Sequence, residues 1–383
     1  MENQMVKLFA CGDIVNYNNA KGELLSDDLA QIIQSMDYSV CNFEAPIQGK
    51  GAPEPKSGIH HSQRAETLSG LKKQGFDLAL LANNHMLDFG KDGLQATIDE
   101  AQRVGLDTVG AGIDEREAYK PLIKKIGDIT IGIINACEAQ FGVIDYFKRS
   151  ESAGYAWINH TLIDKTVLKL KEECDFVLIF PHAGLENYSI PQKEWRERYK
   201  HLCDLGADAV IASHPHVPQG YEQYGKSLIF YSLGNFYFDP GKWAHRKNSS
   251  FSVILTMKKN NAINFEPVYH HMDQGKVEIT QVDQRIDLHN LCSLLGEGYD
   301  QAHDEMVISA YPDVKKHLIS SFFSIPIAFS FKSWTKELAA TLLGRRKNTN
   351  KVLKGMHFTR NEAYYYVLRH GLELEAKQEL NNE

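Results

Sequence analysis

The sequence predicts an α/β (α+β) protein, in which helices cover the faces of a sheet, followed by a mainly helical C-terminal extension. Short apolar runs of strand length alternate with stretches of helix length between residues 6 and 257. Polar side chains follow several of the apolar runs directly. After about Asp283 the strand patterns become sparse and helix formers dominate. We therefore expect one domain over residues 1–283 and an extension over residues 284–383.

The expected elements can be placed in chain order. Buried apolar or β-branched runs predict strands, and several end at a Gly, Asn, His or Pro where the sheet would stop: Val6–Cys11, Tyr38–Asn42, Phe76–Leu81, Asp107–Gly110, Ile129–Ile134, Phe176–Phe180, Ala209–Ala212, Leu228–Ser232 and Ser252–Met257. Intervening stretches predict helices over Ser26–Gln34, Ala65–Gln74, Gly90–Val104 and Gln192–Cys203. The last two strands are expected to be antiparallel because little sequence separates them.

The composition restricts the function classes. Hydrophobic residues make up 43% of the chain and charged residues 24%, which is ordinary for a globular protein. The net charge of −7 and pI of about 6.2 argue against a nucleic-acid partner. Six scattered cysteines without a C-x-x-C pair favour reduced thiols. The first residues, Met1–Lys7, lack signal-peptide features, so we expect a cytoplasmic protein.

The extension carries aromatic and basic residues. The stretch Ile319–Phe331 is uncharged, and Arg345-Arg346-Lys347 follows it. One interpretation is an interfacial membrane helix, which would place the protein peripherally at the inner membrane beside membrane-associated biosynthetic partners. A helical appendage packed on the main domain, or a contact in a homo-oligomer, is the interpretation we favour. Pro326 within the uncharged stretch argues against a continuous span.

Metal-ligating residue types occur where the predicted strands end. Asn84 and His85 follow the central strand, and an Asx turn capping the next helix is the alternative explanation for this pair. Others lie at further strand ends: Asp13, Glu44, His182, His214 and His216. Such a mixed nitrogen and oxygen set is typical of Mn, Zn or Fe sites. The polar ends of strands in an α/β sheet lie together, so we expect one or two divalent transition metals per chain.

These stretches, taken together and in order, resemble the CapA family. The similar motifs are Gly12-Asp13, Asn42-Phe43-Glu44, Ala82-Asn83-Asn84-His85 with Asp88 and Gly90, His182-Ala183-Gly184-Leu185-Glu186, Ser213-His214-Pro215-His216-Val217-Pro218-Gln219-Gly220, and Tyr231-Ser232-Leu233-Gly234-Asn235-Phe236. The family is named for bacterial capsule and poly-γ-glutamate synthesis and belongs to the calcineurin-like metallophosphatase superfamily. The resemblance covers about Val6 to Asp239 and implies a four-layer αββα sandwich.

The resemblance also implies roles for individual residues. Asp13, Glu44, Asn84, His182, His214 and His216 would hold two metals, with Glu44 as the bridging carboxylate. His85 would be the acid that protonates a leaving group. The phosphatase pattern has a His two residues after the first Asp, where this chain has Val15, and an Asp where it has Glu44. The missing histidine removes a ligand, which predicts weak binding of one metal.

Further residues are candidates for chemistry or binding. Glu186 is either a second acid/base, an orienting group for a ligand, or a surface carboxylate. His60, His61 and Arg64 lie in a polar loop and are candidate contacts for an anionic substrate. A bound metal would lower the pKa of its water and polarise a carbonyl or phosphoryl oxygen.

Three functional hypotheses follow. The first is a metal-dependent hydrolase or transferase acting on a phosphoester or on an amide-linked acidic polymer or peptide, in capsule or cell-surface polymer biosynthesis. The second is a metal-dependent peptide epimerase that abstracts an α-proton. The third is a non-catalytic scaffold of a capsule or polyglutamate synthase complex. Loss of activity in His85→Ala would separate a catalyst from a scaffold.

Overall fold

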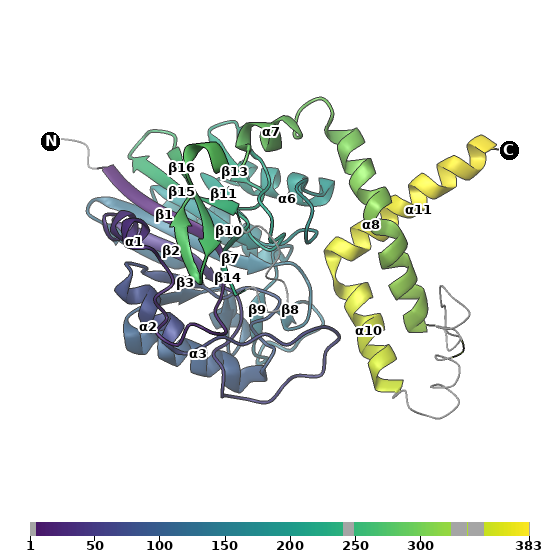
Figure 1. Ribbon diagram of the computed structural model, residues 1–383, viewed down its shortest axis with the longest axis horizontal. Helices are drawn as coiled ribbons and strands as arrows, with labels where there is room; N and C mark the ends of the chain where they lie inside the picture. The colour runs from purple at the N-terminus through teal and green to yellow at the C-terminus, as the bar shows by residue number, and fades with distance from the viewer. Residues whose placement is uncertain (1–4, 240–248, 323–334, 336–347, 383) are drawn as a thin grey trace.

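Two β-sheets face each other in the core of the protein, and helices cover their outer faces (Figure 1). The computed structural model describes residues 5–239, 249–322, 335 and 348–382. The expected four-layer αββα sandwich, with helices in the C-terminal part of the chain, is confirmed.

The first sheet contains most of the N-terminal strands. Its order is β17-β16-β15-β1-β2-β3-β4, with β14 paired to β1. The bounds are β1 Met5–Val15, β2 Tyr38–Phe43, β3 Leu78–Leu80, β4 Asp107–Val109, β14 Asn235–Phe238, β15 Ser249–Lys258, β16 Asn264–Asp273 and β17 Lys276–Ile279. Strands β1 to β4 are parallel, so their carboxyl ends lie at one edge.

The second sheet has the order β12-β13-β11-β10-β7-β6. Its strands are β6 Leu122–Ile126, β7 Ile129–Cys137, β10 Phe176–His182, β11 Ala209–Ile211, β12 Tyr221–Tyr224 and β13 Ser227–Phe230. Strands β7, β10, β11 and β13 are parallel. A small sheet of β5 (Ala111–Gly112), β9 (Gly154–Ala156) and β8 (Val143–Ile144) lies beside them.

The expected antiparallel pair of Leu228–Ser232 and Ser252–Met257 is wrong. The first run is β13, which pairs with β11 and β12 in the second sheet. The second run lies within β15, which pairs with β1 and β16 in the first sheet. An apolar run indicates that a strand is buried, but the long-range pairing decides its sheet, and short separation along the chain was a poor guide.

Side chains alternate between the two faces of each sheet and so build three apolar layers. In β1, Leu8 and Ala10 point into the core between the sheets, whereas Phe9 points to the outer layer. Helices α1 (Asp27–Gln34), α2 (Glu66–Lys73) and α3 (Gly90–Val104) pack on the first sheet, and α5 (Thr161–Glu173) and α6 (Lys193–Asp204) pack on the second. The short helix α4 spans Glu115–Ala118.

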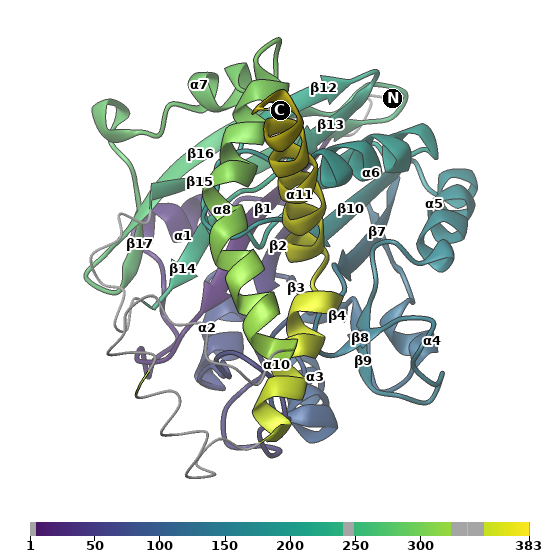
Figure 2. The same ribbon diagram turned by 90° about the vertical axis from the view of Figure 1, so that its right-hand side faces the viewer.

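The C-terminal helices form a separate apolar cluster against the main body (Figure 2). They are α8 Tyr299–Phe322, α10 Asn348–Arg360 and α11 Glu362–Asn382. A short 3-10 turn at Val282–Gln284 and helix α7 (Leu288–Ser293) precede them, and Leu288 of α7 belongs to the core between the two sheets. The division into two domains at residue 283 stays a prediction. Within the described ranges, none of the helices combines the length and apolarity needed to cross a bilayer. Most of the uncharged stretch Ile319–Phe331, and all of Arg345-Arg346-Lys347, lies outside the described residues.

Candidate metal centre

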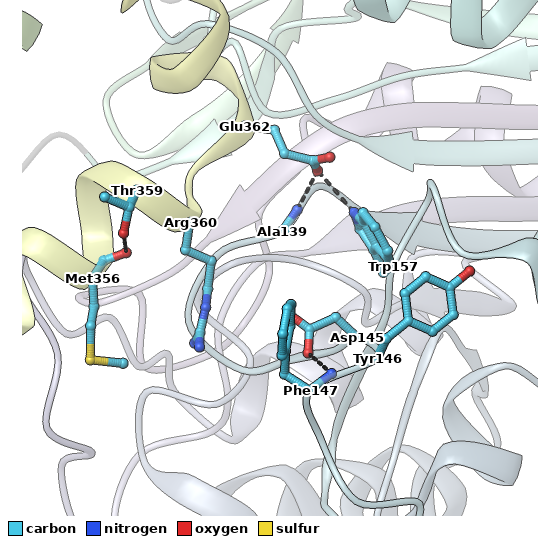
Figure 3. Close-up of a pocket in the computed structure, with 9 residues that line it drawn as sticks. All are labelled: Ala139, Asp145, Tyr146, Phe147, Trp157, Met356, Thr359, Arg360 and Glu362. Carbon is cyan, nitrogen blue, oxygen red and sulfur yellow. Dashed lines mark hydrogen bonds between the residues drawn. The ribbon is translucent and has the colours of Figure 1, made fainter.

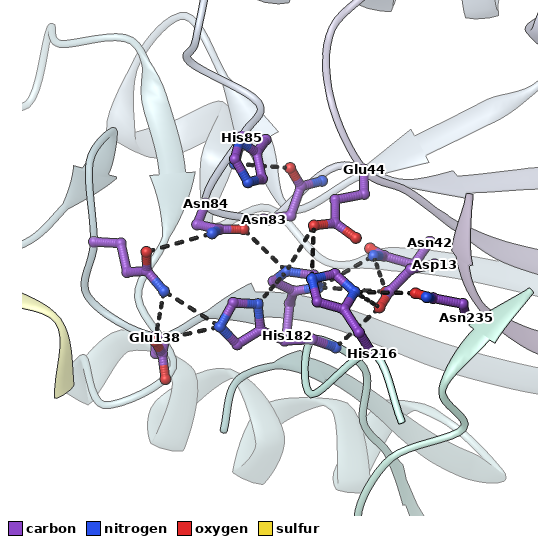
Figure 4. Close-up of polar contacts among 12 residues, drawn as sticks. Asp13, Asn42, Glu44, Asn83, Asn84, His85, Glu138, His182, His216 and Asn235 are labelled. Atoms are coloured by element: carbon purple, nitrogen blue, oxygen red, sulfur yellow. Dashed lines mark hydrogen bonds and ion pairs between the residues drawn. The ribbon is translucent and has the colours of Figure 1, made fainter. Parts of the chain in front are cut away.

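The polar residues predicted from the strand ends come together where the carboxyl ends of the two sheets meet (Figure 4). The first sheet supplies Asp13 from β1 and Glu44 and Asn84 from the loops after β2 and β3. The second sheet supplies His182, the last residue of β10, and two histidines, His214 and His216, that follow β11. All six are buried except His216, which is partly exposed.

The backbone around these residues is tightly constrained. A Cβ at Gly12 would lie 1.8 Å from the carbonyl oxygen of Gly234, so only glycine lets β1 approach this loop. The register of β1 shifts beside Asp13, which turns that side chain toward the second sheet. His214 and His216 adopt positive φ angles of 100° and 60°. Such strain in non-glycine residues is concentrated at functional sites.

His182 lies at the middle of the cluster. Its Nδ1 is 3.1 Å from the amide nitrogen of Asn42, and its Nε2 is 3.2 Å from the side-chain oxygen of Asn84. The Nδ1 of His214 is 3.0 Å from the same Nε2. Asn42 also donates to Asp13 Oδ1 over 2.7 Å, so its side chain holds a histidine and a carboxylate in fixed positions. Burial lowers the pKa of both His182 and His214 well below the usual value, which keeps their ring nitrogens available as ligands.

Glu44 is the most informative side chain in the site. It is 0% exposed, and neither carboxylate oxygen has a hydrogen-bond partner among the residues that the structure describes. Its Oε1 lies 4.0 Å from His182 Nε2 and 3.8 Å from His216 Nε2. Burial, followed by the nearby Asp13, raises the pKa of Glu44 well above the usual value. A buried carboxylate with no donor is costly unless a cation binds it.

The protonation of His216 depends on the two carboxylates beside it. Burial alone would lower the pKa of His216, but the charge of Glu44 and a hydrogen bond to Asp13 raise it to about 10. His216 Nδ1 is 3.3 Å from Asp13 Oδ2 and 3.0 Å from the side-chain oxygen of Asn235. Three sets of ligand atoms lie within 4.8 Å of one another: Glu44 with His182 and His214, Asp13 with Glu44 and His216, and Glu186 with His214 and His216. The residues present therefore fit divalent metal ions with nitrogen and oxygen ligands.

The sequence analysis missed Glu138, a fully buried carboxylate directly after β7. Its Oε1 is 3.6 Å from His214 Nε2 and accepts a hydrogen bond of 2.6 Å from Gln140, while its Oε2 accepts from the backbone of Gly184. Glu138 thus orients the outer nitrogen of one candidate ligand. The same strand-end rule would have found it, because β7 runs to Cys137 rather than stopping at Ile134.

His85 belongs to a second polar cluster at the mouth of the site. Its Nδ1 is 2.7 Å from Asp88 Oδ2, and Lys56 contacts both His85 and the other oxygen of Asp88. A proton on Nδ1 shared with the carboxylate leaves Nε2 with its lone pair. Burial, then the charge of Lys56, lowers the pKa of His85 well below the usual value, so its resting form is neutral. The ring of His61 packs edge-on against it at 4.2 Å between centroids.

The remaining predicted residues separate into two groups. Glu186 lies with His214 and His216 in one candidate ligand set, and His61 contacts His85. His60 instead points its Nε2 at the carbonyl of Glu54, 2.6 Å away. Arg64 contacts the surface residue Glu66 at 3.5 Å, and no contact joins it to the candidate ligands within the described part of the chain. Their predicted roles in substrate binding stay predictions.

The C-terminal helices contribute a carboxylate close to the site. Glu362, at the start of α11, accepts hydrogen bonds from the Ala139 backbone (2.7 Å), the Trp157 indole (3.0 Å) and Asn159 (2.8 Å). It therefore fixes the segment next to Glu138. An open pocket of about 360 Å³ lies at this junction (Figure 3), lined by Ala139, Asp145, Tyr146, Phe147, Trp157, Met356, Thr359, Arg360 and Glu362.

The fold and the arrangement of the site define a four-layer sandwich with a histidine- and carboxylate-rich cluster at the carboxyl ends of both sheets. Residues 7–240 match the family described as bacterial capsule synthesis protein PGA_cap. Because this match covers more than half of the sequence, the chain belongs to that family, as the motifs predicted.

Two curated relatives are similar over most of the sandwich. The capsule biosynthesis protein CapA of Bacillus anthracis is 29% identical over 288 residues, which are 72% of this chain and 69% of the relative. The PGA biosynthesis protein CapA of Bacillus subtilis (strain 168) is 30% identical over 237 residues, 61% of each chain. The solved structure of the calcineurin-like phosphoesterase YfkN from Bacillus subtilis gives a TM-score of 0.40 at 14% identity, covering 79% of this chain and 99% of its own. Similarity at that level is too low to inform function.

Proposed function

We propose that this protein is a metal-dependent hydrolase or transferase that acts on a phosphoester or an amide-linked acidic polymer or peptide. The observation that carries the proposal is Glu44, whose two buried oxygens lack donors among the described side chains and whose Oε1 faces both His182 and His216. The names of the two relatives, capsule and PGA biosynthesis proteins, support a role in assembling a capsule or another cell-surface polymer.

The proposed ligands of the metal are Asp13, Glu44, Asn84, His182, His214 and His216, with Glu186 beside the two last histidines. A divalent cation held there supplies a Lewis acid and makes a nearby water nucleophilic near neutral pH. The six buried or half-buried side chains exclude bulk water from the reacting groups, which strengthens every electrostatic contact in the site. Mn, Zn and Fe all suit this mixture of nitrogen and oxygen ligands.

His85 is the proposed proton-transfer residue. Its contact with Asp88 places the proton on Nδ1, so Nε2 is free to take a proton from a reacting group or to return one. Lys56 contacts the same Asp88 carboxylate and keeps it in place. Because His85 does not belong to a candidate ligand set, its substitution is expected to leave metal binding intact.

Metal content and turnover together test the proposal. We would measure bound Mn, Fe and Zn by mass spectrometry, and hydrolysis of aryl phosphate monoesters, aryl phosphate diesters and γ-glutamyl anilides with each metal added. We expect His214→Ala to lose both metal and turnover, and His85→Asn to keep the metal but lose turnover by about 100-fold or more. The exposed His201 is the control position, since His201→Ala should change neither.

Two results would contradict the proposal. Wild-type protein that binds no metal after addition of Mn, Zn or Fe would exclude a metal-dependent reaction. Metal binding with equal turnover in wild type and His85→Asn would remove the role given to that histidine. Full metal binding without turnover of any of the three substrate classes would instead favour a scaffold.

A further inference from the structure

A second group of metal-ligating side chains lies far from the strand ends, between the second sheet's helix α6 and the C-terminal helices. His303 of α8 is 0% exposed, and neither of its ring nitrogens has a hydrogen-bond partner in the described part of the chain. A fully buried imidazole with no partner for its donor or its acceptor carries an uncompensated desolvation cost. The nearest carboxylate on its own helix, Asp304, is 3.7 Å away, beyond hydrogen-bond distance, and its side chain is 44% exposed.

Two other side chains complete the group. His370 of α11 and Glu194 of α6 contact each other, with 2.8 Å between His370 Nε2 and Glu194 Oε1. The ring centroids of His303 and His370 are 5.0 Å apart, and one ligand atom from each of the three residues falls within 4.8 Å of the others. The second oxygen of Glu194 is buried and, across residues 5–239, 249–322 and 348–382, also lacks a partner.

We propose that Glu194, His303 and His370 bind a zinc ion that fastens the C-terminal helices to the main body. Each of the three comes from a different helix, α6, α8 or α11, so the site forms only when the extension is docked. Two imidazoles and one carboxylate are a known zinc ligand set that leaves a fourth position for water. The side chains of His370 and Glu194 are each 22% exposed, which gives the ion access from solvent.

The surroundings are compatible with a cation. Lys193 is the adjacent positive group, but its ammonium is 2.8 Å from Asp300 and is thereby partly neutralised. Arg196, the other cation of this region, is bound to Glu222 at 2.7 Å and to the Leu295 carbonyl at 2.9 Å.

The contacts that the ion would stabilise extend to the loop beside the candidate metal centre. The apolar cluster of the C-terminal helices includes Leu185, which precedes Glu186 in the His182 loop. Gln192 also donates a hydrogen bond to the Ala363 carbonyl over 2.9 Å at the start of α11. An ion that holds α8 and α11 against α6 would therefore also keep this loop in place, independently of any metal at the sheet ends.

The test is a zinc titration of the full-length chain after chelation, by equilibrium dialysis and mass spectrometry. We compare wild type with His370→Asn and with His289→Asn, a matched control at an exposed position on α7. His370→Asn is expected to bind about one zinc less per chain than wild type, whereas the control should match wild type. Glu194→Gln serves as the second variant and should show the same loss.

A measurement of helix protection distinguishes zinc bound at this site from zinc bound non-specifically. Zinc should slow proteolysis and amide hydrogen exchange of α8 and α11 in wild type and in His214→Ala, but not in His370→Asn or Glu194→Gln. A far-ultraviolet circular dichroism spectrum that matches that of wild type excludes simple unfolding of each variant. Equal zinc content in wild type, His370→Asn and Glu194→Gln would overturn the proposal, as would zinc protection that persists in both variants.

Discussion

Replacement of Glu44 by glutamine should change the stability of the protein in opposite directions with and without metal. In metal-free protein the Glu44 carboxylate is buried beside Asp13, with two oxygens that lack donors among the described residues. The substitution removes the buried charge, and an unsatisfied buried polar group costs about 1–3 kcal/mol, with a larger cost when the group is charged. His216 keeps Asp13 as its ionic partner at 3.3 Å. We therefore expect Glu44→Gln to raise the free energy of unfolding by about 1–3 kcal/mol in chelator.

With metal bound, Glu44→Gln should be less stable than wild type. A cation at 100 times its dissociation constant stabilises the folded wild type by about 2.7 kcal/mol, and the variant, lacking a charged ligand, should gain much less. The stability of the wild type in chelator should also depend on pH. A carboxyl whose pKa is raised by folding binds its proton more tightly in the folded state, so wild-type stability in chelator should fall as pH rises above the unfolded pKa. The advantage of Glu44→Gln in chelator should therefore grow with pH.

Urea unfolding followed by tryptophan fluorescence, in chelator and in excess Mn²⁺, measures both effects. Glu297→Gln, at an exposed position, is the matched control and should track wild type under both conditions. A variant that is less stable than wild type in chelator and gains the same increment from Mn²⁺ would refute the reasoning. Such a result would mean that Glu44 is satisfied by protein or water and does not hold a cation.

Three further changes probe the backbone and the C-terminal helices. Gly12→Ala places a methyl group 1.8 Å from the Gly234 carbonyl oxygen, which neither backbone can avoid, so we expect a loss of about 3 kcal/mol or more in urea unfolding; unchanged stability would contradict the close approach. Gly371→Ala puts its Cβ 2.1 Å from the ring of Tyr311 and should destabilise the packing of α11 on α8 by about 1–3 kcal/mol, seen as faster proteolysis of the C-terminus; equal cleavage rates would argue against this contact. Arg360→Gln removes a cation from the pocket beside Glu362. If the proposed acidic substrate reaches that pocket, its affinity in calorimetry should fall by about tenfold in the variant, and an unchanged affinity would exclude the pocket as a substrate contact.

The candidate site is built from both sheets, and the C-terminal helices reach it through Glu362. Two of the three candidate ligand sets combine residues from both sheets, because Asp13 lies in β1 and Glu44 follows β2, whereas His182 ends β10 and the other two histidines follow β11. Glu362 holds the backbone of Ala139 next to Glu138, which in turn contacts His214. Changes in the docking of α11 are therefore expected to reach a candidate ligand through one hydrogen bond and the 3.6 Å contact between Glu138 and His214.

The sequence by itself determined nine of the strands, most of the candidate ligands and the family. Apolar runs of strand length indicated where these buried strands lie, and polar residues at their ends identified Asp13, Glu44 and His182 as candidate ligands. These features are local, because burial and turn chemistry act on a few neighbouring residues. The motifs that carry the family resemblance are also short and contiguous.

Only the tertiary structure decided which residues meet. The separation of β13 and β15 into different sheets depends on long-range strand pairing. The two apolar runs do not indicate with which strand each of them pairs. Glu138 became part of the site because β7 extends to its neighbour. His303 is left without a partner among the described residues only when three helices from distant parts of the chain pack together. Burial and hydrogen-bond satisfaction are properties of the folded chain, so they identify functional side chains that no local pattern marks.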